Sequence, residues 1–466
     1  MKKRERLRRV ALRGSIALIL LLLAGWFVEN LRGAKAWEEA QARAEAAGMS
    51  LNRADYAGPE IPDEDNLLFK PEFKVEFEME ESARLREWRK MLRLGNPNID
   101  GSRPHQGVTT GYRKWFREEI TESEAQKSVV EAAKEVEKRL ATLSSVILET
   151  PVHSVFAKGE ATQDFMESTE WTLPILGFTK CFEDSGVLAI RQGNGELALE
   201  RIRALCRLSQ MTQGSSLISL LISNAMKSKA MGLVWEGLLF RVWDDAQLTV
   251  LQSEFSDLKY EERLERAIAF EAAWGIEYLS FIELGGEGIT GVKITEPDSF
   301  LNSYYYGGLQ GWKDRRRAII IDGALGLLEV FRTRDFEGLK KERNPNPSPY
   351  SPMYAVAGAH LLISGTLNGG AWRPATESRI CRVALAAERA FLKDGTYPKN
   401  ISGLELEFST TDLTDPEERE LAYDLGPNER PQIWSRFQEE FGDDGEERLR
   451  WQFWSEGMRV GKVAPN

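Results

Sequence analysis

Residues 14–28 read GSIALILLLLAGWFV, a run of fifteen positions without a charged side chain. Extended backward past Arg13, the run approaches the roughly 20 residues that a helix needs to cross the hydrocarbon core of a bilayer. The long side chain of Arg13 can reach the headgroups at one end, and Trp26 and Phe27 lie at interface depth at the other. We therefore predict a transmembrane anchor over residues 14–31.

The residues before this run are strongly basic. Residues 1–13 contain seven Lys or Arg and one Glu, a net charge of +6. Because basic residues beside a span stay in the cytoplasm, we expect a cytoplasmic basic tail over residues 1–13 and an extracytoplasmic, periplasmic body. A cleaved signal peptide is the alternative, with Ala-Lys-Ala at residues 34–36 as its cleavage site. Because that site lies far beyond the run and contains Lys35, an uncleaved signal-anchor is preferred.

The body has the composition of a folded, acidic protein. The chain has 466 residues, 42% of them hydrophobic, which is enough for a large core in two or three packed units. Its net charge of −11 leaves −17 for the residues after the basic tail. Such a body is repelled by phosphate backbones, so we expect no nucleic-acid partner.

Helical periodicity dominates the body. Residues 36–47 are rich in Ala and Glu and are followed by Gly48, which predicts a helix that continues the anchor. Asp244 and Gln247 form a capping pair that predicts the start of another helix. The clearest apolar stripe lies between residues 122 and 148 and consists of Val129, Ala133, Val136, Leu140, Leu143 and Ile147.

These patterns predict a mainly α fold with an N-terminal transmembrane helix. We expect stacked helical hairpins over residues 122–394 and a small α+β segment over residues 395–466. Strand-like pieces in that last segment include residues 420–425 and 449–454. Residues 32–121 contain a Pro-rich acidic stretch and are predicted to be a linker or strap.

A long Gly- and Tyr-rich stretch, residues 284–311, contains the candidate ligand or partner surface. Three adjacent tyrosines, Tyr304, Tyr305 and Tyr306, cannot all face inward, and Trp312 follows closely. We interpret them as a surface for a partner or a glycan, with packing of the loop as an equal alternative. The G-x-G-x-x-G spacing at residues 286–291 lacks the strand before it and the helix after it that a dinucleotide site needs.

No residue pattern in the chain predicts catalysis. The three histidines are scattered, and no nucleophile motif is present. Asp443 and Asp444 offer oxygen ligands of the kind that Ca²⁺ takes, without full EF-hand spacing, so a plain turn is preferred. Three cysteines, Cys181, Cys206 and Cys381, form no C-x-x-C. A Cys181–Cys206 disulfide that leaves Cys381 over and simple buried thiols are the alternatives, and the buried thiols are preferred.

Residues 382–398 read RVALAAERAFLKDGTYP and are followed by Gly403-Leu404 and Asp415-Pro416. This resembles the globular part of type II secretion major pseudopilins, in which a long helix leads into a G-x-Y-P turn and a short sheet. The resemblance covers about the last fifth of the chain. It implies a small α+β tail and, at Asp443 and Asp444, an acidic loop that binds Ca²⁺ in that family. No prepilin peptidase site precedes the anchor, so polymerisation is not implied.

Two functional hypotheses follow. The first is a membrane-anchored, exported helical protein that binds or scaffolds envelope or secretion proteins and is not an enzyme. The second is an exported hydrolase of an envelope polymer or glycan that uses scattered carboxylates and the region of residues 304–312.

Overall fold

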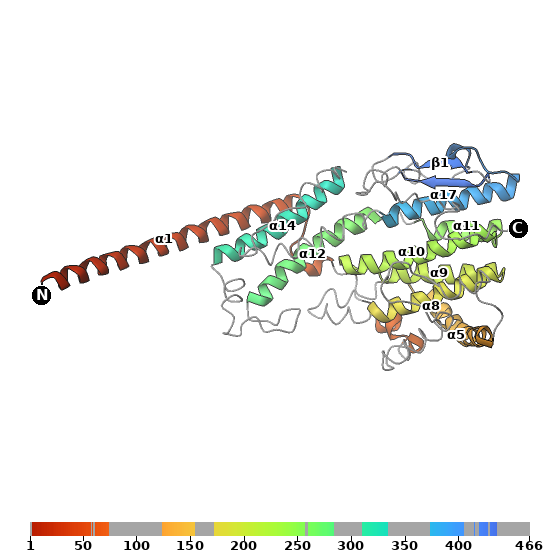
Figure 1. Ribbon diagram of the computed structural model, residues 1–466, viewed down its shortest axis with the longest axis horizontal. Coiled ribbons are helices and arrows are strands. Elements are labelled where there is room, and N and C mark those ends of the chain that lie inside the picture. The colour runs from red at the N-terminus through yellow and green to blue at the C-terminus, as the bar shows by residue number, and fades with distance from the viewer. Residues whose placement is uncertain are drawn as a thin grey trace. The chain divides into compact units, whose positions relative to one another are not determined.

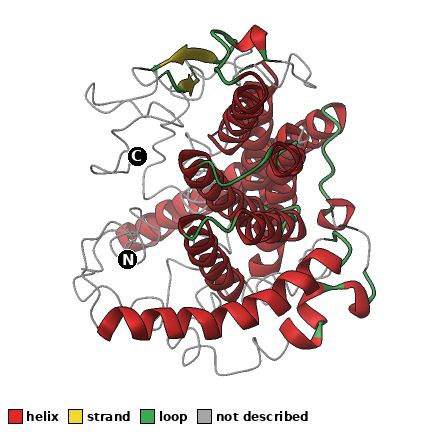
Figure 2. Ribbon diagram, turned by 90° about the vertical axis from the view of Figure 1, so that its right-hand side faces the viewer, coloured by secondary structure: helices red, strands yellow, loops and turns green. Residues whose placement is uncertain are grey.

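The computed structural model describes residues 2–56, 58, 61–73, 124–153, 172–256, 260–283, 310–333, 373–404, 414, 419–426 and 429–435. This part of the chain is mainly helical and carries one small sheet, which confirms the predicted fold class (Figures 1 and 2). It divides into two compact units. Unit 1 comprises Met1–Tyr56 and Glu265–Asn368, and unit 2 comprises Ala57–Leu264 and Gly369–Asn466. Each unit is assembled from separated stretches of chain, whereas the predicted domains are consecutive.

Helix α1, Lys2–Ala46, contains both the predicted anchor and the helix predicted after it, without a break. Its large apolar side chains from Leu12 to Leu31 are each at least 48% exposed. The helix ends at Ala46, and Gly48 follows with a φ of +74°, a left-handed conformation that suits glycine just after a helix C-terminus. The N–H of Met49 then donates to the carbonyl oxygen of Ala44 and closes the last turn.

Unit 1 is built on α1, on α14 and on α12 from Glu265 onward. Helix α14, Gln310–Thr333, packs along the second half of α1, as Figure 1 shows in teal and red. Helix α12, Tyr260–Glu283, runs antiparallel to α14, because Glu265 pairs with Arg332 and Ser280 contacts Arg317. A short 3₁₀ helix, η1 (Arg53–Tyr56), follows α1.

Unit 2 is a stack of helical hairpins. Helix α9 packs against α8 and α10, α5 packs on α9, and α17 covers α10 and α11. Asn194 caps α9, and the predicted Asp244–Gln247 pair forms a capping box at the start of α11. The bounds of these helices are α5 Glu124–Glu149, α8 Thr172–Arg191, α9 Gly195–Met211, α10 Leu217–Phe240, α11 Asp245–Glu254 and α17 Arg373–Asp394. Two 3₁₀ helices, η2 (Asp63–Asp65) and η3 (Leu67–Phe69), precede them, and η4 (Ile401–Gly403) follows.

Two helices of the described chain, α1 and α10, are long and apolar enough to cross a membrane. They differ in their surroundings, because no residue in the apolar window of α1 is buried whereas 61% of that of α10 is buried inside the protein. Met226, Val234 and Leu238 of α10 lie in the main hydrophobic core of unit 2. Helix α10 therefore has the burial of a core helix.

The sheet is a hairpin of two antiparallel strands, β1 (Ala422–Leu425) and β2 (Pro431–Trp434), with Tyr423 opposite Ile433. Ile433 is fully buried, and β2 packs against α17. Strand β1 was predicted, and β2, which begins with a proline, was not. The strand predicted over residues 449–454 lies outside the described residues.

Candidate functional site

Helices α1 and α14 touch backbone to backbone at two glycines. A Cβ built on Gly33 would lie 2.1 Å from the carbonyl oxygen of Gly311, and one built on Gly311 would lie 2.1 Å from that of Glu29. No non-bonded atoms approach so closely, so only glycine fits at either position. Ala40 and Ala44, both fully buried, continue this face of α1. The helix that carries the exposed apolar run is thus itself a core helix of unit 1.

Polar contacts fix the same junction. The Asn30 side-chain oxygen accepts a hydrogen bond of 2.9 Å from the Gly311 N–H, one of the first N–H groups of α14, which have no partner within the helix. The Glu29 carboxylate lies 3.4 Å from the Arg315 guanidinium. Further along, Arg43 and Asp322 pair at 2.6 Å. Exposed pairs of this kind each contribute about 1 kcal/mol or less, so their main effect is to set the register of the two helices.

The chain that leaves α1 is also held in unit 1. Arg53, with its side chain only 6% exposed, reaches Glu277 of α12 through two contacts of 3.0 and 3.3 Å. Tyr56 donates a hydrogen bond to the Ser50 carbonyl oxygen and meets the Phe270 ring edge-on. Burial raises the pKa of the Tyr56 hydroxyl. Residues on both sides of Gly48 are therefore bound to the same unit.

The D-G-T-Y-P motif forms the turn that follows α17. Gly395 adopts φ +72°, and its N–H donates to the Phe391 carbonyl oxygen. The Tyr397 ring stacks on that of Phe391, with 4.6 Å between centroids, and its hydroxyl donates to Glu388 at 2.6 Å. The Arg241 guanidinium lies 4.1 Å from the centroid of the Phe391 ring and donates to the Tyr397 hydroxyl.

This turn is a structural connection between α17 and the sheet. The Pro398 carbonyl oxygen accepts a hydrogen bond from Tyr423 of β1. Burial raises the pKa of Glu388, and burial together with the Glu388 carboxylate raises the pKa of Tyr397. Tyr397 therefore stays protonated, and its hydrogen bond to Glu388 holds the turn against α17.

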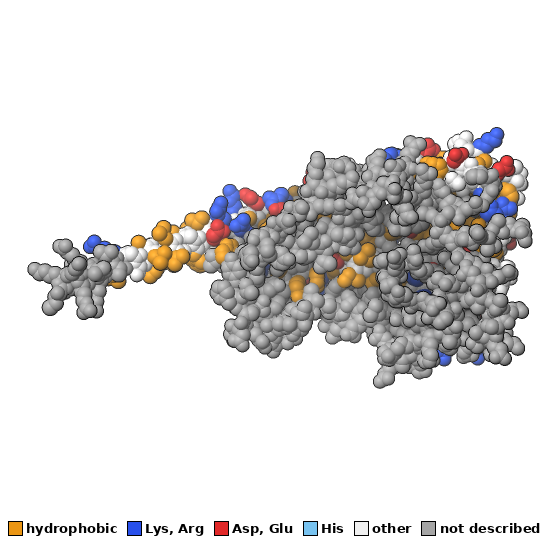
Figure 3. Space-filling model, viewed as in Figure 1, with side chains coloured by type: hydrophobic (Ala, Val, Ile, Leu, Met, Phe, Trp, Pro, Cys, Tyr) orange, Lys and Arg blue, Asp and Glu red, His pale blue; other side chains and the backbone are white. Residues whose placement is uncertain are grey.

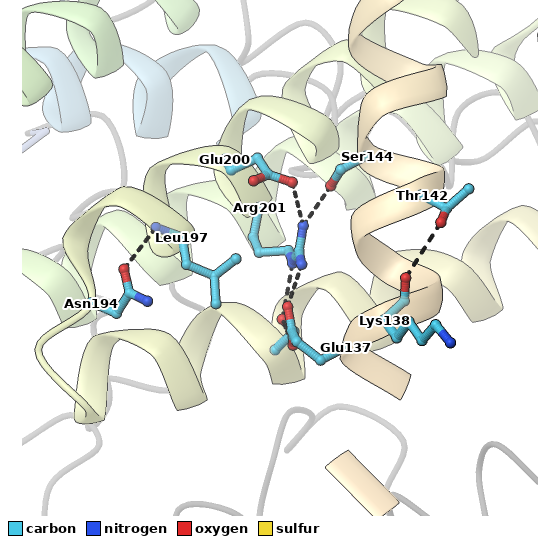
Figure 4. A network of polar contacts seen from close by, with 9 residues as sticks. Glu137, Lys138, Thr142, Ser144, Asn194, Leu197, Glu200 and Arg201 are labelled. Carbon is cyan, nitrogen blue, oxygen red and sulfur yellow. Dashed lines mark hydrogen bonds and ion pairs between the residues drawn. The ribbon is translucent and has the colours of Figure 1, made fainter. Parts of the chain in front are cut away.

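A second buried network joins α5, α8 and α9 (Figure 4). Arg201 is fully buried and forms an ion pair with Glu137. It also donates to Ser144 at 2.6 Å, to Glu200 at 2.6 Å and to Ser185 at 2.9 Å. All three guanidinium nitrogens are engaged, so this arginine clamps three helices together.

The residues singled out in the sequence are mostly not described. Trp312 is a partly buried residue in the first turn of α14, next to Gly311. Tyr304, Tyr305, Tyr306, Asp443 and Asp444 lie outside the described residues, so the partner surface, the Ca²⁺ loop and the hydrolase hypothesis keep only their support from the sequence. The α1–α14 junction was missed, because a contact between residues 30 and 311 leaves no local signal in the sequence.

The chain has no match among known protein families, curated proteins or solved structures. The pseudopilin resemblance therefore stays a prediction. All three cysteines are buried and free, as preferred, and burial raises the pKa of the Cys206 and Cys381 thiols. Within the described ranges, no three His, Cys, Asp or Glu side chains are grouped to hold a metal ion.

Proposed function

We propose that this protein is a single-pass membrane tether, in which α1 crosses the bilayer and holds the helical body at its extracytoplasmic face. There the body binds other envelope or secretion proteins. The observation that carries this proposal is that α1 is one continuous helix with two environments: an exposed apolar part, followed by a part packed into unit 1.

The exposed part of α1 favours a bilayer on energetic grounds. Burying one large apolar side chain contributes about 1.5–3 kcal/mol, and a dozen such side chains between Leu12 and Leu31 lie open to solvent. The hydrocarbon core of a bilayer can surround a single helix and cover apolar side chains on all of its sides. The helix also satisfies its own backbone hydrogen bonds, as a spanning segment must.

The packed part of α1 favours an uncleaved anchor over a signal peptide. Residues 34–36, the candidate cleavage site, lie inside the helix, directly after Gly33. Cleavage after Ala36 would remove Gly33 and Asn30, which contact Gly311. The mature body would then lose part of its own core interface.

Membrane attachment and orientation can be tested on the full chain. We expect it to stay in the membrane pellet after alkaline carbonate extraction, with its intact N-terminus, and a C-terminal reporter to be active only outside the cytoplasm. A Leu20→Arg and Leu22→Arg variant should leave the membrane, whereas Leu20→Ile and Leu22→Ile should remain. A mature N-terminus at residue 37, or a reporter active in the cytoplasm, would contradict the proposal.

The binding role has its own test. Cross-linking in intact cells followed by gentle solubilisation should recover the chain with stable envelope partners. The Leu20→Arg and Leu22→Arg variant is the control, because it displaces the body from the membrane. Recovery of the anchored chain alone and monomeric would count against a scaffold.

A further inference from the structure

Basic side chains gather where the exposed apolar stretch of α1 ends (Figure 3). We call Arg32, Lys35, Lys313 and Arg315 the junction patch. The first two belong to α1 and the last two to the first turns of α14. The side chains of Arg32, Lys35 and Arg315 are 71%, 77% and 45% exposed, and Lys313 is partly exposed. Arg32, Lys35 and Arg315 are thus accessible to a large charged surface, although each also pairs with an acidic side chain.

The contacts of unit 1 place this patch at one level along α1. Glu29, the first residue after the apolar run, contacts Arg315, and Asn30 binds the N–H of Gly311. From there α1 and α14 run in the same direction, because Arg43 pairs with Asp322 further on. Residues 29–35 rise about 9 Å along the helix. The headgroup layer on one side of a bilayer is about 5–8 Å thick, so these residues extend across it.

The patch is positive although the body is acidic. Residues 29–35 together with residues 311–317 contain six Lys or Arg and two acids. Arg316 is buried, and the remaining residues carry a net charge of +3, against −17 for the chain after residue 13. Of the two acids, Glu29 lies between Arg32 and Arg315, and Asp314 is paired with Arg317. Glu38 and Glu39 come one helical turn further from the apolar run. Lys35 and Glu39 pair at 3.7 Å, both largely exposed.

We propose that the junction patch binds anionic phospholipid headgroups in the extracytoplasmic leaflet, on the side of the bilayer where the body lies. This inference rests on the proposed function, because it needs α1 to span the bilayer. Basic side chains beside a membrane attract anionic lipid over about one Debye length. The attraction would orient unit 1, because α14 packs directly against α1 at Gly33. Trp312 lies in the first turn of α14 beside Gly311. Tryptophan is enriched at the membrane–water interface, the depth proposed for this turn.

Lipid selectivity of the reconstituted full chain tests this. The chain is placed in vesicles of phosphatidylcholine and phosphatidylglycerol, and the relative association of spin-labelled forms of the two lipids is measured. We expect the variant carrying Arg32→Gln, Lys35→Gln and Arg315→Gln to lose about twofold or more of its selectivity for phosphatidylglycerol. Salt should weaken the wild-type selectivity.

Two matched variants separate charge from structure. Arg32→Lys with Arg315→Lys keeps the charge and should retain the selectivity. Lys138→Gln, Arg203→Gln and Lys399→Gln remove three exposed charges from unit 2 and should also retain it, while all variants keep the basic tail. If the triple variant has poor helicity, Lys35→Gln alone should still lower the selectivity, since the Lys35 side chain is 77% exposed and pairs with an exposed acid.

The outcomes distinguish the two proposals. If the variant with Arg32→Gln, Lys35→Gln and Arg315→Gln kept the wild-type selectivity, the junction patch would be overturned and the tether would stand. An equal loss of selectivity in this variant and in the variant with three charges removed elsewhere would show that only overall charge matters. That result would also overturn the junction patch. A chain that fails to insert into vesicles would overturn the tether and, with it, this inference.

Discussion

Two glycines at the α1–α14 junction allow close packing because they have no side chain. Gly33 and Gly311 bring two backbones to a separation at which no Cβ fits, whereas Gly14 and Gly25 of the same helix have nothing within 4 Å of a built Cβ. The difference separates a glycine that fits a contact from one that lies in the exposed run. It also supplies a matched control on one helix.

Gly33→Ala should loosen the junction. Because the clash is with backbone, the helices must separate, and overpacking of this kind destabilises by about 1–3 kcal/mol. We expect faster amide hydrogen exchange in α14, measured by mass spectrometry on the detergent-solubilised chain. Gly25→Ala should leave that exchange unchanged. Unaltered α14 protection in Gly33→Ala would mean that the helices do not meet at this point.

Glu388 predicts a pH dependence for unit 2. Its folded-state pKa is raised by burial, so the folded state holds its proton more tightly than the unfolded chain does. The stability contributed by this group is therefore present at low pH and is lost as the pH rises through the raised pKa. Urea unfolding at a series of pH values should show this decline in the wild type and not in Glu388→Gln. Parallel profiles for the two proteins would contradict it.

At the scale of elements, helices were predictable and their contacts were not. The stripe ending in Leu140, Leu143 and Ile147 predicted α5, and all three side chains are buried. Helix α8 was missed, because its sequence mixes Pro174 and several polar residues with its apolar ones. The partners of Arg201 lie on three helices, up to 64 residues away. Periodicity in the sequence indicates which face of a helix is buried. Which helices that face packs against depends on contacts between segments far apart in the chain.

The Arg201 clamp gives a prediction for helix packing. Arg201→Ala removes a fully buried side chain that joins α5, α8 and α9, leaves a cavity and strips its partners of their donors. We expect unit 2 to lose about 3 kcal/mol of stability, read as a lower urea midpoint. Arg203→Ala on the same helix removes an arginine that is 43% exposed and pairs with Glu254, and should change stability by less than 1 kcal/mol. Equal effects would show that burial does not set the importance of these arginines.

At the scale of the whole molecule, α1 belongs to the proposed membrane anchor and to the body at once. A chain beginning at residue 37, the product of cleavage after Ala36, lacks Asn30 and Gly33 but keeps Ala40 and Ala44. Because the Gly33–Gly311 contact and the Asn30 hydrogen bond are gone, unit 1 should be weakened while the separate core of unit 2 is intact. We expect amide exchange to rise in α14 and in the part of α12 that pairs with it, and to stay unchanged in α9 and α10. A chain lacking only residues 2–9 should match the full-length protein in both units, since the junction begins at Glu29. If α14 were as protected from exchange in the chain from residue 37 as in the full-length protein, residues 1–36 would be a detachable leader rather than an anchor.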